Sequence, residues 1–209
     1  MAKKKSRFGC LLVAGVLVAA GWLGRDTIAD WLAGFDIGIS AQPSERLAER
    51  AESKIDRLFR LGLTEPVRFS EAELQSLVTY RALLTLPAGI EDPRVDVQDS
   101  IVVVSALVRP ADLEASGPDA IMSLLADTSR VIGAMVPSID RPGWLTVRVE
   151  SLQVGALVVP SFMIPMVIEG LGEQGLSTSG GAIVSPVPRD VGSIEIDGND
   201  VVLIPADSQ

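Results

Sequence analysis

The stretch that decides the fold is Ile101–Val108, with the sequence IVVVSALV. In a β-strand every second side chain lies on the same face. One face of this strand carries Val102, Val104, Ala106 and Val108, and the other carries Ile101, Val103, Ser105 and Leu107. A strand that is nearly apolar on both faces must be covered on both sides. Burial in a domain core meets that requirement, and so does a face that lines a cavity of lipid size.

Segments on either side of Ile101–Val108 predict an antiparallel sheet. Arg94–Val97 precedes the turn sequence Gln98-Asp99-Ser100, and together with Ile101–Val108 they predict a hairpin. Trp144–Gln153 alternates apolar and polar residues, which predicts a half-buried strand. The sheet is therefore expected to hold at least these three strands.

The C-terminal end predicts a second hairpin. Asp197-Gly198-Asn199 is a strong turn sequence between Ser193–Ile196 and Val201–Ile204. Residues 206–209 follow this hairpin, and we expect them to form a frayed tail.

Helical signals occur before and between the predicted strands. Ser44–Leu61 repeats apolar residues at helical spacing, and Gly62 is a natural stop. Ser70 and Glu73 form a capping box, so a second helix is expected to begin at Glu71.

A third helix is predicted between Pro118 and Pro137. Its apolar residues are Ile121, Leu124, Leu125, Ile132 and Met135. A fourth helix is predicted over Phe162–Leu171, where Glu169 is the only charged residue. This helix is apolar nearly all round, which fits burial in the core and also fits contact with acyl chains or a membrane.

The N-terminal segment Phe8–Leu23 holds sixteen residues without a formal charge, and Lys3, Lys4, Lys5 and Arg7 precede it. A basic edge before an apolar run targets the secretory machinery and keeps the N-terminus in the cytoplasm. A spanning helix needs about 20 apolar residues, with about 17 as the lower limit, so this one is short. Length and flanks favour an uncleaved single-pass anchor, whereas Val18-Ala19-Ala20 also fits a cleaved signal peptide.

These boundaries divide the chain into four parts. Residues 1–24 are a membrane anchor or signal, and residues 25–43 are a juxtamembrane linker. The linker fits an amphipathic stretch on the bilayer as well as an ordinary connection. Residues 44–205 form a single α+β extracytoplasmic domain, followed by the frayed tail 206–209.

The charge of the domain excludes one class of partner. Four of the eighteen basic residues precede Phe8, so fourteen face 27 acidic residues beyond that point, a net charge of −13. An acidic domain repels phosphate backbones, and nucleic acid is therefore not an expected partner.

The amino acid composition also narrows the chemistry. The chain has no histidine, and its single cysteine, Cys10, lies in the apolar N-terminal segment. Zinc sites built on imidazole or thiolate and Ser-His-Asp or Cys-His nucleophiles are excluded as a result. We expect no metal and no internal disulfide.

Two further motifs have structural explanations. Gly170, Gly172 and Gly175 match G-x-G-x-x-G, but a dinucleotide site requires these glycines between a strand and a helix. Here they follow a predicted helix, so we expect them to end it, and we expect no cofactor.

Pairs of carboxylates occur at a hairpin tip, Asp197 and Asp200, and in a first helical turn, Glu71 and Glu73. Turn chemistry and helix capping account for both pairs. The sequence therefore predicts a protein that is not an enzyme, although a site built on carboxylates alone stays open.

The order of these elements resembles that of a known family. The segments VRFSEAELQSL, IVVVSALV, WLTVRVESLQVG, VVPSFMIPMVIEGL and SIEIDGNDVVLI follow one another over Val67–Pro205. This order is similar to that of the YpmS-like and LmeA-like bacterial envelope proteins, which look related to tubular lipid-binding domains. The segment VVPSFMIPM is bulkier and more apolar here than in the family. The resemblance implies an N-terminal membrane helix followed by a curved antiparallel sheet packed on helices around an apolar groove.

The apolar strand and the apolar helix fit such a groove, whose lining would bury acyl chains. We therefore expect a membrane-anchored domain that binds or shuttles lipid, in a bacterial inner membrane with the domain periplasmic or otherwise extracytoplasmic. The expected lipid-binding residues are Val102, Val104, Phe162, Ile164, Met166 and Val167. The alternative is a non-catalytic envelope scaffold whose apolar helix contacts a partner protein.

Overall fold

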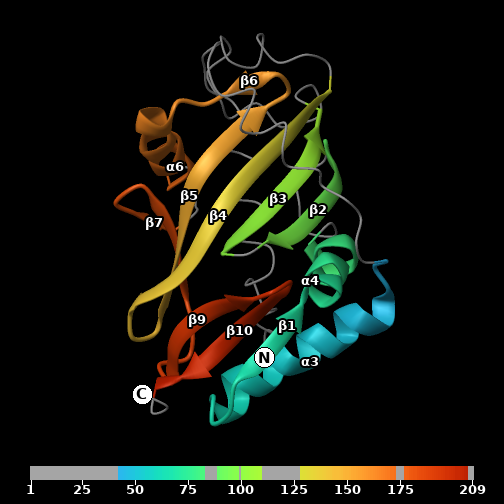
Figure 1. Cartoon of the computed structure of the whole chain (residues 1–209), viewed down its shortest axis with the longest axis vertical. Helices are drawn as coiled ribbons and strands as arrows, with labels where there is room; N and C mark the ends of the chain where they lie inside the picture. The colour runs from blue at the N-terminus through green and yellow to red at the C-terminus, as the bar shows by residue number, and fades with distance from the viewer. Residues whose placement is uncertain (1–41, 83–88, 99, 110–127, 173–176, 207–209) are drawn as a thin grey trace, which may run out of the picture.

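Strand β3 (Ile101–Val108) lies second in a seven-stranded antiparallel sheet with the order β2-β3-β4-β5-β8-β7, in which β6 also pairs with β5. The computed structural model describes residues 42–82, 89–98, 100–109, 128–172 and 177–206. The other strands of this sheet are β2 (Ile90–Gln98), β4 (Ser129–Arg141), β5 (Trp144–Val154), β6 (Leu157–Val158), β7 (Thr178–Ser179) and β8 (Ala182–Pro186). The strands form an open, curled sheet (Figure 1).

A smaller antiparallel sheet has the order β1-β10-β9. Its strands are β1 (Val67–Ser70), β9 (Val191–Asp197) and β10 (Asp200–Pro205). The predicted C-terminal hairpin is confirmed, since β9 and β10 pair from Asp200 opposite Asp197. Gly198 in the turn has φ +62°, a conformation that glycine adopts without a steric penalty.

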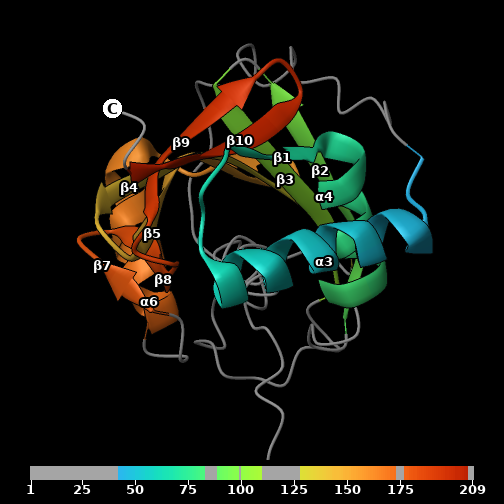
Figure 2. The same ribbon diagram turned by 90° about the horizontal axis from the view of Figure 1, so that it is seen from below.

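Helix α3 (Glu45–Leu61) packs across the smaller sheet, and Figure 2 shows it running along the open side of the curl. Ala51 of α3 is buried with Phe69 of β1. The prediction of this helix is confirmed, including its start and its end. The side chain of Ser44 accepts a hydrogen bond from the N–H of Leu47, and Gly62 follows the last turn with φ +78°.

Helix α4 (Glu71–Leu77) continues into one π-helical segment, η2 (Val78–Ala82). The predicted capping box is confirmed, because the Ser70 hydroxyl accepts from the N–H of Glu73 and the Glu73 carboxylate accepts from the N–H of Ser70. The last described helix, α6 (Ile164–Gly172), follows a 3-10 turn, η4 (Ser161–Met163). It confirms the helix predicted over Phe162–Leu171, with Pro165 in the first turn, where proline is tolerated.

The third predicted helix is wrong over its second half. Ile132 and Met135 lie in β4, which pairs with β3 on one side and with β5 on the other. Apolar residues fill both faces of this strand, so their spacing also fitted a helix. Pro137 was expected to end a helix, but it lies in the part of β4 beyond Met135, where β5 is the remaining partner. Proline is tolerated at such edge positions.

Besides β4, the strands β7 and β8 of the larger sheet were not predicted. Ala182–Pro186 forms β8 within a stretch rich in glycine, serine and proline, and β7 pairs with it. Gly180 and Gly181 turn the chain between them with φ +60° and +74°. Strand β1 was also missed, because its four residues are too few for a periodicity signal.

A bulge in β5 keeps its apolar side chains on one face. Val149 pairs with Met135 and Ser151 pairs with Ala134, which leaves Glu150 as the extra residue. The bulge shifts the alternation by one position, so Val149 and Leu152 lie on the same side of the sheet. The half-buried strand predicted over Trp144–Gln153 is thereby confirmed, with its buried residues out of phase after Glu150.

Several expectations lie outside the described residues. These are the membrane segment 1–24, most of the linker 25–43, the first half of the third predicted helix, and residues 207–209 of the frayed tail predicted over 206–209. Within the described ranges, none of the helices has the length and apolar character needed to cross a membrane.

Candidate functional site

One side of the larger sheet forms a continuous apolar surface, which we call the inner face. Directly paired residues of neighbouring antiparallel strands lie on the same face. Pairing of Val95 with Val104, Val104 with Gly133, and Gly133 with Leu152 therefore places one row of side chains across four strands. The inner-face residues of the common core, with Val102 packed against them, are Ile90, Val95, Val97, Val104, Ala106, Val108, Val131, Met135, Leu145, Val147, Val149, Leu152, Val154 and Ile183.

Three other elements contact the same core. Leu58 of α3 and the α6 residues Ile164 and Ile168 belong to it, and Ile194 of β9 packs against it. Ile164 and Ile168 are one helical turn apart, so one flank of α6 is buried on the sheet. Figure 1 places α6 beside β5 at the edge of the curl. Parts of the inner face are therefore covered by α3, α6 and the smaller sheet.

The structure brings four of the six predicted lipid-binding residues into this core. Val104 and Ile164 are buried, and Val102 and Val167 are partly buried against the same cluster. Phe162 is not part of it, because it is 76% exposed in the 3-10 turn η4 that precedes α6. The side chain of Met166 lies outside the described part of the structure. The predicted set is thus divided among the inner face of β3, the buried flank of α6 and the exposed Phe162.

The prediction that β3 is covered on both sides is confirmed. Val103, Val104, Ser105 and Ala106 are each no more than 2% exposed, although they alternate between faces. The second side of the sheet, the outer face, is more polar than the inner one. On it Val103 pairs with Asp96, and Ser105 pairs with Arg94.

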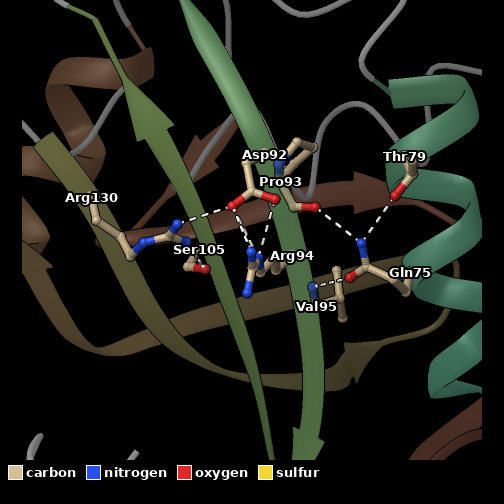
Figure 3. A network of polar contacts seen from close by, with 8 residues as sticks. All are labelled: Gln75, Thr79, Asp92, Pro93, Arg94, Val95, Ser105 and Arg130. Carbon is tan, nitrogen blue, oxygen red and sulfur yellow. Dashed lines mark hydrogen bonds and ion pairs between the residues drawn. The ribbon is translucent and has the colours of Figure 1, made fainter. Parts of the chain in front are cut away.

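A network of charged side chains lies on this outer face, at the point where β2 has a shift in its strand pairing (Figure 3). The pairing of β2 with β3 shifts between Glu91 and Arg94, and Asp92 adopts a positive φ of 45° there. Arg94 and Arg130 each place a guanidinium nitrogen 2.9 Å from Oδ2 of Asp92. Partial burial opposes ionisation of Asp92, but hydrogen bonds from the two arginines outweigh it and lower its pKa. The network therefore stabilises the bulge with ionised partners.

Side chains of helix α4 form hydrogen bonds with backbone groups at the edge of β2 that does not pair with another described strand. The backbone N–H of Val95 donates to Oε1 of Gln75 at 2.6 Å, and Nε2 of Gln75 donates to the carbonyl of Pro93 at 3.0 Å. Oε2 of Glu71 accepts from the N–H of Val97 at 3.4 Å. An unprotected edge strand offers these groups to other chains. The side chains of α4 occupy them instead.

Glu71 and Asp96 form a buried acidic pair that the sequence did not reveal. Each is 6% exposed, and Nδ2 of Asn199 donates to Glu71 at 3.2 Å. Burial raises the pKa of Glu71 and the nearby carboxyl of Asp96 raises it further, whereas hydrogen bonds from Val97 and Asn199 act in the opposite direction. Helix capping was expected to explain both Glu71 and Glu73, but it explains only Glu73.

The buried acidic pair does not resemble a binding site for metal. Within the described ranges, three or more potential metal-ligating side chains do not gather at any point. A surface hollow lies elsewhere, along α3, and is lined by Glu49, Glu52, Ser53, Asp56, Arg57, Arg60 and Leu61. Its charged lining does not suit an acyl chain.

The glycine motif lies in a different context from a dinucleotide site. Gly170 and Gly172 belong to the end of α6, which follows a 3-10 turn. The expectation that they end a helix is confirmed for Gly172, whereas Gly175 lies outside the described residues.

Comparison of the chain with protein-family models, curated proteins and solved structures gives no match. The similarity to YpmS-like and LmeA-like proteins therefore stays a prediction from the order of sequence elements. The inner face is the candidate site on the strength of its own composition and geometry.

Proposed function

We propose that this chain is a membrane-anchored lipid-binding protein whose extracytoplasmic domain holds an acyl chain on the inner face, in the manner of tubular lipid-binding domains. The observation that carries the proposal is the inner face itself. It extends from Val95 on β2 to Ile183 on β8, and the buried flank of a short apolar helix covers its β5 and β8 end. A curled sheet with an apolar concave side is a common way to enclose an extended apolar ligand.

Entry of a lipid requires α6 to move away from the sheet. This uncovers Ile164 and Ile168, at a cost of about 1.5–3 kcal/mol for each side chain. Burying an acyl chain of about 14 methylenes gains about 11 kcal/mol relative to water. The exchange is therefore favourable for a chain taken from water. For a chain taken from a bilayer the acyl chain itself gains almost nothing, because the bilayer is already apolar, so uncovering the two isoleucines leaves the bound state about 3–6 kcal/mol less favourable.

Weak retention of this kind suits a domain that receives lipid and releases it again. The segment Phe8–Leu23 supports this function as a tether, since it raises the local concentration of bilayer lipid at the domain. The acidic domain has little electrostatic attraction of its own to anionic lipid. We accordingly place residues 1–24 in the inner membrane and residues 44–205 on its extracytoplasmic side.

Native mass spectrometry of the full chain released from mild detergent tests the proposal. We expect mass increments that correspond to acyl lipids. Val102→Phe places a larger side chain at a partly buried inner-face position, and we expect it to lower lipid occupancy several-fold. Ile132→Phe is the matched control, because Ile132 is a partly buried residue of the adjacent strand on the outer face. Equal occupancy in both variants contradicts the proposal.

Phe162 favours a second candidate function, a scaffold that contacts an envelope protein. Phe162 is 76% exposed beside the apolar helix α6, so its ring is available to a partner, and aromatic residues are enriched at protein interfaces. This function predicts that Phe162→Ala weakens a complex recovered in mild detergent while lipid occupancy stays unchanged. Loss of lipid occupancy in the same variant instead favours the lipid-binding function.

A further inference from the structure

Ser185 introduces a polar side chain into the inner face. It lies in β8 directly opposite Leu145, one alternation away from the pair formed by Ile183 and Val147. Because paired residues share a face, the Ser185 side chain lies on the same side of the sheet as Leu145, Val147 and Ile183. Ser185 is 7% exposed, and these three neighbours belong to the common core.

The hydroxyl of Ser185 has no hydrogen-bond partner in the part of the chain that the structure describes. Two other buried serines are satisfied. Oγ of Ser76 donates to the carbonyl of Ala72 at 2.6 Å, and Oγ of Ser105 accepts from Arg130 at 3.3 Å. A buried hydroxyl without a partner is unfavourable compared with alanine at the same position. Its place among apolar side chains therefore calls for a partner that lies on the inner face.

The chemistry of the inner face restricts that partner. A lipid that leaves a bilayer gains little from its acyl chain, so polar contacts decide which lipid is bound. None of the inner-face core residues around Ser185 carries a charge. An ionised carboxylate would lose its hydration there in exchange for one neutral hydroxyl, which is strongly unfavourable. An uncharged ester carbonyl loses less and accepts one hydrogen bond.

We infer that the Ser185 hydroxyl donates a hydrogen bond to the ester carbonyl of a bound lipid, so that the domain selects esterified acyl chains over free fatty acids. This inference rests on the proposed lipid-binding function and adds the class of ligand. The serine supplies the donor, and the apolar rows on β5 and β8 receive the chain that leads away from the ester.

The test uses the full chain in nanodiscs and three photoreactive probes of equal chain length, each with a diazirine in the chain: a methyl ester, a free fatty acid and a hydrocarbon. We expect the ester to label peptides of β5 and β8 most strongly. Ser185→Ala should reduce ester labelling there about tenfold relative to hydrocarbon labelling, the effect of losing one hydrogen bond in an apolar site. Ser185→Thr keeps the hydroxyl and should retain the preference.

Ser105→Ala is the matched control, because it removes a buried hydroxyl from the outer face of the same sheet and should leave the labelling ratio unchanged. Thermal unfolding of each variant verifies that it is folded. If all three probes label the inner face and Ser185→Ala leaves their ratio unchanged, the inference about the ester is overturned and lipid binding stands. If none of the probes labels the inner face of the wild-type chain, both proposals are overturned.

Discussion

The backbone N–H of Val95 donates to the side-chain oxygen of Gln75 at 2.6 Å, and this bond joins helix α4 to the free edge of the larger sheet. The same side chain reaches Pro93 with its nitrogen (Figure 3). The side-chain amide of Gln75 thereby pairs with one backbone donor and one backbone acceptor, to which a further strand could otherwise form hydrogen bonds. The helix protects an edge that would be open to pairing with another chain.

Gln75→Ala removes these two hydrogen bonds and a third to the hydroxyl of Thr79, and it leaves the groups of Val95 and Pro93 unpaired. We expect a loss of about 2 kcal/mol in the free energy of unfolding and a fall in Tm of about 4–8 °C. Light scattering should also show faster aggregation. Gln153→Ala is the control, since Gln153 bonds only to nearby Gly155 among the described contacts. A similar loss in both variants argues against edge protection by Gln75.

The acidic pair predicts a pH dependence of stability. Because the folded-state pKa of Glu71 is raised, the native chain binds more protons than the unfolded chain between the ordinary glutamate pKa and the raised value. Stability therefore falls as pH rises through that window and is independent of this group above it. Glu71→Gln keeps an acceptor for Val97 and adds a donor toward Asp96. We expect it to stabilise the domain by about 1 kcal/mol at neutral pH, with the gain vanishing in acid.

Denaturant unfolding between about pH 4 and pH 8 measures this dependence. Glu73→Gln, two residues along the same helix, is the matched comparison and should have the opposite effect at neutral pH. A Glu71→Gln variant that is less stable than the wild type at neutral pH would show that the buried carboxylate is satisfied as an anion.

Glu73 differs from Glu71 because cations surround it. Its side chain is 4% exposed and lies 2.6 Å from Nζ of Lys54 and 3.3 Å from Nε of Arg50. Lys54→Met should destabilise the domain by about 1–3 kcal/mol, since it removes one partner of a buried charge. Arg60→Met removes an exposed i,i+4 pair with Asp56 and should cost less than about 0.5 kcal/mol. Equal effects of the two substitutions in thermal unfolding contradict this difference.

Gly62 and Gly198 both have a positive φ, but we expect alanine to destabilise the domain more at Gly62 than at Gly198. A Cβ at Gly62 would overlap the carboxylate of Asp190, which accepts a hydrogen bond from the N–H of Leu63. Gly62→Ala should therefore cost about 2–4 kcal/mol through backbone strain and a displaced hydrogen bond. Gly198→Ala has open space around its Cβ and should cost about 1 kcal/mol. Similar losses at the two positions would exclude the contact with Asp190 as the cause.

The elements with local signals could be predicted from the sequence. Ser44 and Gly62 define the ends of α3, and Gly198 lies in the turn between β9 and β10. The burial of β3 on both faces also followed from its composition. Each of these features depends on residues that are close together in the chain, so no knowledge of long-range contacts was needed.

The remaining features depend on contacts between distant segments. The sequence pattern predicts a helix where the first part of β4 forms, because apolar residues on both faces of a strand also fit helical spacing. The meeting of Glu71 with Asp96 requires the packing of α4 on β2. Ile164 is buried and Phe162 is exposed, but the sequence could not show this difference because both lie in the same uniformly apolar segment. The fold decides which side of that segment is buried.

The central claim, that an acyl chain lies on the inner face, is tested most directly by mapping where a bilayer lipid crosslinks. The full chain is reconstituted in nanodiscs with a phospholipid that carries a diazirine in one acyl chain, irradiated, digested and sequenced by mass spectrometry. The proposed function predicts crosslinks at inner-face residues such as Val102, Val147 and Ile183, in addition to those in Phe8–Leu23. Crosslinks confined to Phe8–Leu23 would contradict it.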